Sequence, residues 1–587
     1  MTAIPAWPNT SDSQVIFDHF GPETTVAVPT RRVPGTELIY LNTPWLAREG
    51  FEVFPASKRS RLEHAFLNAF SLQSVVAGVD GNGPELRADR YGASGGSPHG
   101  GSGRAASIGP YNLKGIGRTP LVAQTESASH RDGRLSLVEA IREAISSEIA
   151  AAELPGGAVP ILAIIALPPR IANENYAQRD AIVVRPNVLR PAHFERSIFF
   201  GNAGFAGSDQ FRDAIRVSDF VRYATTKADA LTSHIPGGFC KWIAGIAHQL
   251  GAMHAHRLWQ GKFLSANITV AASLLDFGSF RAVPTWHAYY GKPEERFGSE
   301  PAYLASAIRS LHKHFAKYSA APLPPLDRTL THAATAIEGG FQEAVTNVLG
   351  HGLDAARATA VADILHRYFQ RQQSSRCQIG DALITPLFWL EWHSSDPNKR
   401  PGVAERRVWD EIGELLEGTG TAGDDAAHRL RHWLAPRANL YYEVQRPAIG
   451  AFLEGLKGTK NSAACTAFIE NSIGAARRHF PGLRGVGPIV GHAISSGTEI
   501  VYRRRPAGDQ LEAWFRTYPI AGSDLVWLLG KPLPRDNFAS ADLDANDGWI
   551  SRRFEEDVLT NGGAFSIKGR NFELPPASIE AKKVDRS

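Results

Sequence analysis

Apolar residues follow two different spacings over the first 200 positions of the chain. Short apolar and β-branched runs, bounded by glycine, proline and polar residues, are typical of strands. These runs occupy 38–41, 111–114, 159–167 and 181–184. Two longer segments, 58–72 and 134–152, carry an apolar residue every three or four positions, which predicts amphipathic helices. The first third of the chain is therefore expected to mix short strands with a few helices.

The helical spacing dominates after about residue 210. One helix is predicted at 243–258, and a long helical region begins at 301 and continues to about 480. Between them, 267–270 and 273–275 have the pattern of two short strands joined by a tight turn. β-Type runs return after 485, which predicts a small α+β appendage at the C-terminal end.

The length of 587 residues exceeds what one hydrophobic core usually supports. We expect an α+β fold in which a small sheet-bearing lobe precedes a large helical lobe, as in a protein kinase. The expected units are an N-terminal segment packed on the core (1–80), the small lobe (81–200), the helical lobe (201–400), a helical extension (401–484) and the C-terminal appendage (485–587).

Composition and charge restrict the partners and the compartment. The chain is 43% apolar and 21% charged with a net charge of +4, so it lacks the broad basic field typical of nucleic-acid binding. Its three cysteines have no short spacing, which excludes a disulfide framework and a cysteine zinc site. No apolar stretch reaches the ~20 residues of a membrane helix, and no secretory signal is visible. We expect a cytoplasmic protein without a membrane or nucleic-acid partner.

Candidate metal ligands lie in the predicted turn region. Asp276 follows an apolar run and precedes Phe277-Gly278, and Asn267 lies nine positions upstream across the predicted hairpin. Carboxylate and amide oxygens suit Mg²⁺ or Mn²⁺, and kinases hold magnesium with an Asp and an Asn placed in this way. For each residue alone, an ordinary strand exit or turn is an equally acceptable interpretation.

Candidate phosphate ligands lie in the predicted small lobe. Lys114 ends a strand, and a lysine that meets a triphosphate needs a carboxylate to hold its ammonium group. Glu143 on the following helix is one partner, and Glu139 and Glu148 on the same helix remain alternatives. Arg185 and Arg190 flank Pro186 and Asn187 after a strand, and two arginines at this spacing can clamp an anionic group.

These residues stand in segments that together resemble the SelO (YdiU) family of protein adenylyltransferases, which have a protein-kinase-like fold. The matching segments are LKGIGRTP (113–120), DGRLSLVEAIREAISSE (132–148), AIVVRPNVLRPAHFE (181–195), ANITVAASLLDFGSF (266–280) and ERFGSEPAYLASAIRSL (295–311). The resemblance extends over about 15–320, fades beyond about 400, and has no counterpart for the tail after 485.

The resemblance implies a role for each matching position. The nucleotide would be contacted by Gly101, Gly103, Arg104, Asp132 and Gly133. Lys114 would contact phosphate and pair with Glu143. The outer phosphates would be held by Arg185 and Arg190, and the metal by Asn267 and Asp276. It further implies that ATP is bound in a flipped orientation. AMP is then transferred to a protein Ser, Thr or Tyr hydroxyl or to a small-molecule acceptor.

The chain departs from the family pattern at two positions of chemical importance. Ala266 stands where the family has an aspartate proposed as the general base. Ser102 replaces an aspartate of the family's glycine loop, which corresponds here to the glycine- and serine-rich loop predicted at 91–109. Alanine cannot accept a proton. Ala266 is compatible with an introduced change, with a natural variant whose acceptor needs no base, or with a nucleotide-binding pseudoenzyme that serves as a scaffold. Kinase-type phosphoryl transfer is a further alternative.

Overall fold

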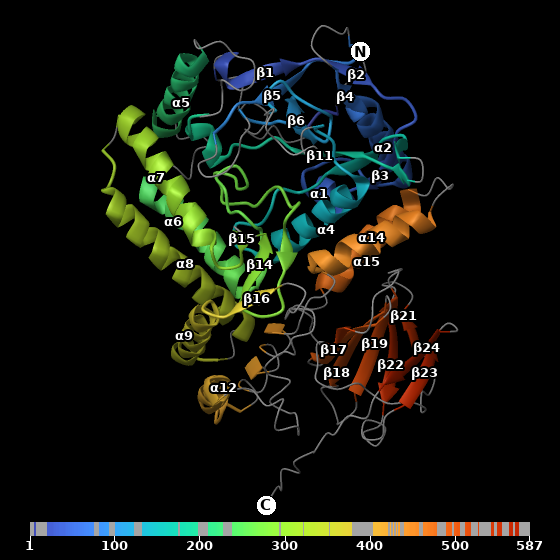
Figure 1. Ribbon diagram of the computed structural model, residues 1–587, viewed down its shortest axis with the longest axis vertical. Coiled ribbons are helices and arrows are strands. Elements are labelled where there is room, and N and C mark those ends of the chain that lie inside the picture. Colours follow the sequence, from blue (N-terminus) through green and yellow to red (C-terminus); the bar gives the residue numbers. More distant parts are fainter. Residues whose placement is uncertain are drawn as a thin grey trace, which may run out of the picture.

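The computed structural model (Figure 1) describes residues 5–7, 20, 22–75, 81–92, 100–122, 132–173, 176–197, 209–226, 238–292, 295–320, 322–350, 353–378 and 403–420, and shorter segments between 423 and 574. Its first part is built on a seven-stranded sheet in which every neighbouring pair is antiparallel. The strand order is β1 (Thr25–Val28), β5 (Leu86–Asp89), β6 (Ala105–Ile108), β7 (Tyr111–Lys114), β11 (Ala181–Pro186), β8 (Ala163–Ala166) and β3 (Glu37–Leu41).

The N-terminal segment is part of this sheet. The expected segment 1–80 supplies β1 and β3, which are its two edge strands. The strands predicted at 38–41, 111–114 and 181–184 are confirmed, and the run at 159–167 yields the shorter strand β8.

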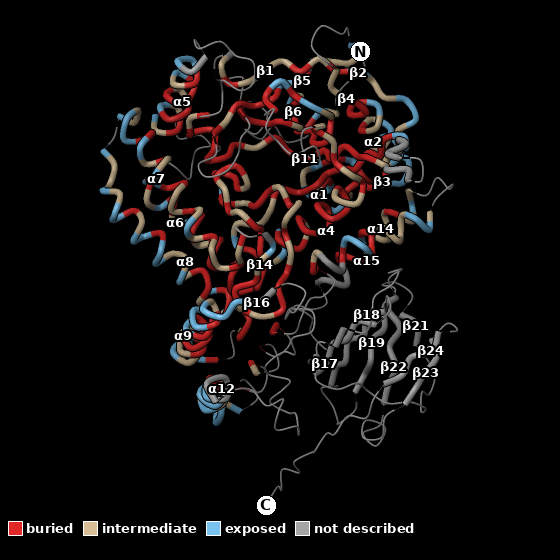
Figure 2. The backbone as a smooth tube through the Cα atoms, in the orientation of Figure 1, coloured by how far each residue is buried: buried red, intermediate tan, exposed pale blue. Residues whose placement is uncertain are grey.

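Two helices cover the two faces of the sheet. On one face Ile164 and Val183 pack in the same core as Ile141 of α4 (Leu137–Glu153). On the other, Ile165 joins Phe66 of α2 (Ala56–Phe70). Since successive strand residues point to opposite faces, β8 and β11 are buried on both sides, which explains why their sequences are continuous β-branched runs. Figure 2 shows this buried region at the centre of the sheet and along α4.

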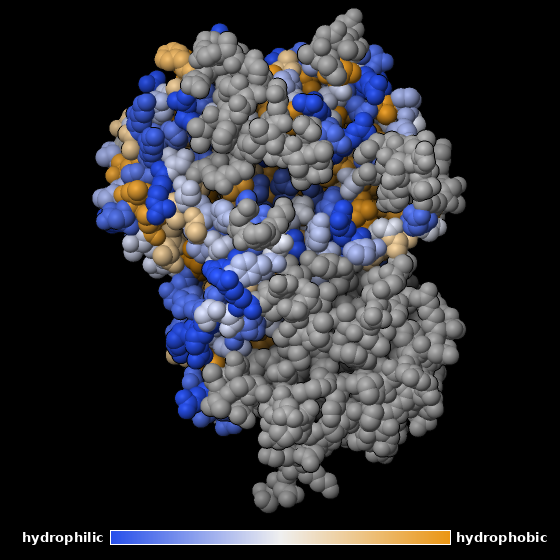
Figure 3. Space-filling view, viewed as in Figure 1, coloured by the Kyte–Doolittle hydropathy of each residue, from blue (hydrophilic) through white to orange (hydrophobic). Residues whose placement is uncertain are grey.

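The helical part contains α5 (Asp209–Thr226), α6 (Phe239–Ala255), α7 (Glu300–Tyr318), α8 (Leu326–Leu349) and α9 (Ala355–Gln372). Helix α6 is its centre and is buried on most of its surface, whereas the outer faces of α7 and α8 are partly exposed and hydrophilic (Figures 2 and 3). The predicted helices at 58–72, 134–152 and 243–258 correspond to α2, α4 and α6.

The helical extension continues with α12 (Val403–Leu416), α14 (Tyr442–Gly455) and α15 (Ser462–Arg477). Helices α14 and α15 pack against α4, as Figure 1 shows. Thr466 in α15 also donates a hydrogen bond of 2.9 Å to the backbone carbonyl of Ile39 in β3. The extension is therefore attached to the sheet-bearing part of the molecule.

The remaining described elements are short or lie in the tail. The short ones are η2 (Pro22–Thr24), β2 (Thr30–Arg32), α1 (Thr43–Arg48), β4 (Leu72–Ser74), β9 (Arg170–Asn173), β10 (Tyr176–Gln178), η3 (Pro191–Phe194), β12 (Leu258–Trp259), β13 (Arg281–Ala282), β14 (Ala288–Lys292), β15 (Glu295–Arg296) and β16 (Arg376–Gln378). The tail has β17 (Ile489–Ser495), β18 (Thr498–Arg504), β19 (Leu511–Thr517), β20 (Val526–Trp527), β21 (Asp542–Asp544), β22 (Trp549–Phe554), β23 (Gly563–Ile567) and β24 (Arg570–Leu574).

The described part of the tail contains strands alone, in place of the expected α+β appendage. Six of them form a sheet in the order β20-β17-β18-β19-β22-β21, and β23 pairs with β24. Across all the described ranges, none of the helices combines the length and the apolar character needed to span a membrane.

The prediction of two strands at 267–270 and 273–275 is wrong, because neither segment forms a strand. An isolated bridge joins Ile268 and Leu274, and Leu275 N donates to Asn267 O at 3.1 Å, but this pairing does not extend into strands because other backbone groups bond to distant residues. Val270 N donates to Leu189 O at 3.0 Å, and Leu274 N donates to Gly157 O at 3.1 Å. The segment is a turn held by its surroundings rather than by a β ladder.

Helices α6 and α8 approach closely because glycine occupies the contact. A Cβ atom added to Gly340 would lie 2.1 Å from His248 O, whereas one added to the adjacent Gly339 would meet no atom within 4 Å. We expect Gly340→Ala to lower the free energy of unfolding by about 1–3 kcal/mol through overpacking. Gly339→Ala should raise it by about 0.5–1 kcal/mol, because alanine favours the helix. Urea denaturation measures both, and equal effects of the two variants would contradict the close contact.

Candidate functional site

Three elements bring a lysine and two carboxylates together. Lys114 ends β7, Glu143 lies on α4, and Asp276 follows the turn after α6. Lys114 Nζ donates to Glu143 Oε1 at 2.6 Å and to Asp276 Oδ1 at 2.6 Å. The side chains of Lys114 and Glu143 are 2% and 1% exposed, whereas that of Asp276 is 34% exposed. The ion pair expected between Lys114 and Glu143 therefore forms in the interior, and Asp276 extends it toward the surface.

The other two glutamates on α4 have different partners. Glu139 accepts a hydrogen bond of 2.9 Å from Arg142, and Glu148 accepts one of 2.6 Å from Asn42. Glu143 is thus the residue that the geometry selects from the three alternatives left open by spacing.

The backbone of Asp276 and its charge environment are both unusual. Its φ angle of 65° lies in the left-handed region, which non-glycine residues seldom adopt. Burial alone would raise its pKa, but the positive charges of Lys114 and then Arg104, with the hydrogen bond from Lys114, hold the pKa of Asp276 far below its ordinary value. The carboxylate is consequently ionised at any physiological pH.

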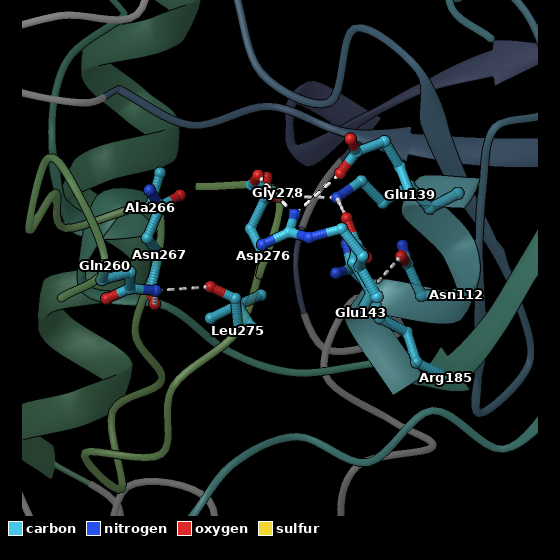
Figure 4. Close-up of polar contacts among 12 residues, drawn as sticks. Asn112, Glu139, Glu143, Arg185, Gln260, Ala266, Asn267, Leu275, Asp276 and Gly278 are labelled. Atoms are coloured by element: carbon cyan, nitrogen blue, oxygen red, sulfur yellow. Dashed lines mark hydrogen bonds and ion pairs between the residues drawn. The ribbon is translucent and has the colours of Figure 1, made fainter. Parts of the chain in front are cut away.

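Two side chains hold the segment that carries Asp276. Arg142 is fully buried on α4 and donates to Gly278 O at 2.9 Å and to Phe280 O at 2.6 Å. On the other side, Gln260 Nε2 donates to Leu275 O at 2.8 Å, and Figure 4 shows this contact beside Asp276. The segment is clamped before and after the carboxylate, which keeps a strained residue in place.

Three arginines add positive charge around the same carboxylate. Arg185 on β11 is 3% exposed, and its Nε donates to Asn112 Oδ1 at 3.0 Å (Figure 4). Its terminal nitrogens have no hydrogen-bond partner within the described ranges. Burial lowers the pKa of Arg185, and the charge of Arg190 contributes further. Arg104, at the start of β6, acts on Asp276 through its charge.

The site has more positive than negative charge. Its cations are Lys114, Arg104, Arg185 and Arg190, and its carboxylates are Glu143, Asp276 and Asp89. Buried arginine ends without a carboxylate partner are unfavourable unless an anion completes them. The arrangement suits a polyanion with planar oxygen groups, such as a polyphosphate.

A hydrogen-bond chain connects the glycine loop to Arg190. Ser102 Oγ donates to Asp89 Oδ1, and Asp89 Oδ2 lies 3.0 Å from His193 Nε2. His193 Nδ1 accepts from Arg190 N at 3.0 Å, so Nε2 carries the ring proton. Arg190 Nη1 in turn donates to Ala266 O at 3.1 Å. Ser102 and Ala266 thus lie at the two ends of this series of hydrogen bonds.

The environment of position 102 explains why a serine fits there. Burial opposes ionisation of Asp89, but the hydrogen bond from His193 and the charge of Arg190 hold the pKa of Asp89 well below its ordinary value. An aspartate at position 102 would face this second buried carboxylate, whereas serine donates a proton to it.

Ala266 lies in a small apolar cluster. Its side chain is 6% exposed and packs with Ala192 and the partly buried Tyr91. The ring of Tyr91 lies under the guanidinium of Arg190 at 5.0 Å, and burial raises the pKa of the Tyr91 hydroxyl. The phenol is therefore protonated at neutral pH and is not a ready proton acceptor.

The glycine positions of the resemblance have steric reasons. Gly101 has a φ of 147°, and a Cβ atom there would lie 2.2 Å from Asp89 O. Gly103 O accepts from Thr119 N at 3.0 Å, which holds the loop beside β7. Residues 93–99 of the predicted glycine-rich loop lie outside the described residues.

Asp132 and Gly133 form the turn before α4. Gly133 O accepts from Gly117 N at 3.1 Å, and a Cβ atom on Gly133 would lie 2.2 Å from Gly117 C. Asp132 Oδ1 accepts from Arg134 N at 2.9 Å, so this carboxylate stabilises its own turn. Among the described side chains, no hydrogen bond or ion pair joins Asp132 to Lys114 or Asp276.

Asn267 and Asp276 are adjacent through the backbone. Leu275 N donates to Asn267 O at 3.1 Å, and Asn267 Nδ2 donates to Lys262 O at 3.4 Å. Within the described ranges, neither Asn267 Oδ1 nor Asp276 Oδ2 accepts a hydrogen bond. Two unused oxygens on neighbouring segments fit a hard divalent cation that takes its other ligands from phosphate and water. A group of three or more acidic, histidine or cysteine ligands does not occur in the described part.

Comparison with known proteins adds no assignment. No protein-family description matches this chain, and a search of curated proteins finds no significant relative.

Several contributors to the site were not predicted from the sequence. These are Asn112, which bonds to Arg185, and Arg142 and Gln260, which each donate to two backbone carbonyls. The only available signal was that Arg142 interrupts an apolar helix directly before Glu143, since charged residues are seldom fully buried without partners.

The buried pair predicts a large effect of removing one partner. Lys114→Met leaves the Glu143 carboxylate buried without a cation, so we expect a loss of about 3–5 kcal/mol in the free energy of unfolding at pH 7. In Lys114→Met/Glu143→Leu the orphan charge is absent, and most of that loss should be recovered. Urea denaturation of the three proteins measures the difference. A double variant as unstable as Lys114→Met alone would contradict the pairing.

Proposed function

We propose that this site binds ATP with Mg²⁺ and transfers AMP to a hydroxyl or carboxylate acceptor, as in SelO-like nucleotidyltransferases with a bilobal kinase-like fold. One observation carries the proposal: the buried Lys114–Glu143 pair reaches Asp276 through the lysine ammonium group. The charge of Arg185 also acts on this carboxylate, and its terminal nitrogens have no hydrogen-bond partner among the described residues. In kinase-fold enzymes the lysine–glutamate pair and the metal-binding aspartate are the parts that position the phosphates.

The residues divide the work in the proposed reaction. Lys114, Arg185 and Arg190 hold the phosphates, and Asn267 and Asp276 would hold the cation, which neutralises phosphate charge when bound. The acceptor oxygen forms a bond to the α-phosphorus while the bond to the bridging oxygen breaks and pyrophosphate leaves. Arginines stabilise the charge that develops on pyrophosphate. The acceptor proton passes to solvent, because Ala266 cannot take it.

A second candidate function is nucleotide binding without turnover. It is favoured by the packing of Ala266 against Ala192 and Tyr91, which places an apolar cluster where a base would be needed. General-base loss typically lowers a rate by about 10²–10⁴-fold. The metal ligands and the arginines are still present, so slow transfer remains compatible with this site.

Binding and group transfer are tested in one experiment. Calorimetry with the full-length chain and Mg²⁺ should detect binding of ATP. Asp276→Ala should abolish the metal-dependent binding of ATP, and Arg185→Met should weaken the affinity for ATP about 10–100-fold. Arg309→Met, which changes an exposed arginine of α7, should bind like the wild type. ATP labelled at the α-phosphorus should then label the protein or an added acceptor.

The position of the label separates the alternatives. Transfer of the γ-label alone would reject adenylylation in favour of a kinase. Tight binding with no transfer would support the pseudoenzyme, and no ATP binding would reject the proposed function altogether.

Restoring the base position gives a further test. In Ala266→Asp the new carboxylate lies next to Arg190, and transfer of the α-label should rise by about 10²–10⁴-fold. Ala266→Asn has nearly the same shape but cannot accept the proton, and it should remain at the wild-type rate. Equal rates for the two variants would show that the chemistry uses no base at this position.

A further inference from the structure

The helical extension reaches the candidate site through a tyrosine. Tyr442 is the first residue of α14, and the guanidinium groups of three arginines lie over its ring, with Arg446 of the same helix the most distant at 5.8 Å. The Cζ atoms of Arg142 and Arg281 both lie 4.5 Å from the ring centroid. Arg281 lies in addition 5.1 Å from the ring centroid of Trp259. Trp259, Arg281, Tyr442 and Arg142 therefore form a series of alternating aromatic and cationic groups, which we call the stacking series.

Both arginines of the stacking series bind the segment that follows Asp276. Arg142 donates to the carbonyls of Gly278 and Phe280, and Arg281 Nε donates to Ser279 O at 3.2 Å. Arg142 is also the neighbour of Glu143 on α4. The Tyr442 ring thus contacts Arg142, which holds Gly278 and Phe280 against α4, and Arg281, which stabilises the same segment from within.

An ion pair supports the same contact. Arg446, one turn after Tyr442 on α14, lies 3.2 Å from Glu139 of α4, and Glu139 also accepts from Arg142. Glu139 partly neutralises the cations around the ring. Cation–π contacts are stronger when the cation is withdrawn from water, and Arg142 is fully buried. The stacking series is therefore a specific contact rather than a chance crossing of surface side chains.

We propose that Tyr442 is a positioning residue, by which α14 holds the Asp276 segment and α4 in the geometry that binds nucleotide. This inference rests on the proposed function. Removing the ring frees Arg142 and Arg281 to adopt other rotamers, and only part of the population then keeps residues 276–281 in place. The affinity for nucleotide then falls in proportion to the fraction of molecules that keep these residues in place. The helical extension thereby acquires a role at the site without contacting the nucleotide.

The test compares aromatic and aliphatic replacements of Tyr442. Tyr442→Leu removes three cation–π contacts, those of Arg142, Arg281 and Arg446, and should weaken Mg·ATP binding about tenfold in calorimetry. Tyr442→Phe keeps the ring and should bind within about twofold of the wild type, since the contact is made by the ring face. Hydrogen exchange of residues 276–282, measured without nucleotide, should rise in Tyr442→Leu and stay unchanged in Tyr442→Phe.

Phe468→Leu is the matched control. Phe468 of α15 stacks on Phe452 of α14 with centroids 4.2 Å apart, so its loss weakens the extension without touching the stacking series. It should leave affinity and exchange unchanged. Wild-type affinity and exchange in Tyr442→Leu, or equal losses in Phe468→Leu, would overturn the inference. If the wild type binds no ATP, the proposed function fails, and the exchange measurement still decides whether Tyr442 holds the segment.

Discussion

The site depends on the cost of burying Lys114 and Glu143. A charge withdrawn from water is tolerated only with a partner in good geometry, and this pair joins the end of β7 to the middle of α4. The sheet and the helix therefore have one favourable relative placement. Asp276 is drawn to the same ammonium group, which brings the turn after α6 to the sheet. One buried cation thus sets the relation of three elements that are distant in sequence.

A second polar chain adjusts the surroundings of this cation. Asp89 is ionised although it is buried, because His193 and Arg190 compensate for lost water. Ser102 can donate to that carboxylate, which an aspartate could not do at neutral pH. Ser102 therefore supports the carboxylate whose charge acts on Arg190, whereas Ala266 contributes a backbone carbonyl to Arg190 and an apolar side chain to its surroundings.

Local pattern predicted the elements better than their pairing. Strands β8 and β11 are buried on two faces, which produces continuous β-branched runs, and α4 is buried on one face, which produces an apolar stripe. Both patterns can be seen in the spacing of apolar residues along the sequence. The prediction of two strands at 267–275 was wrong because Val270 and Leu274 donate to the distant acceptors Leu189 and Gly157, which nothing in the local sequence encodes. Arg142 and Gln260 escaped prediction for the same reason, since their roles arise only from carbonyls that the fold delivers to them.

The extension illustrates how this limit matters for function. Nothing in the sequence around Tyr442 marks it as part of the site, and it lies 166 positions after Asp276. Its importance comes from Arg142, which is adjacent to Glu143 and has two carbonyls of the following segment as acceptors. A buried arginine needs hydrogen-bond acceptors for its nitrogens and also a partner for the flat face of its guanidinium group. An aromatic ring is such a partner for the flat face. The same physical requirement that pairs Lys114 with Glu143 thus links α14 to the site.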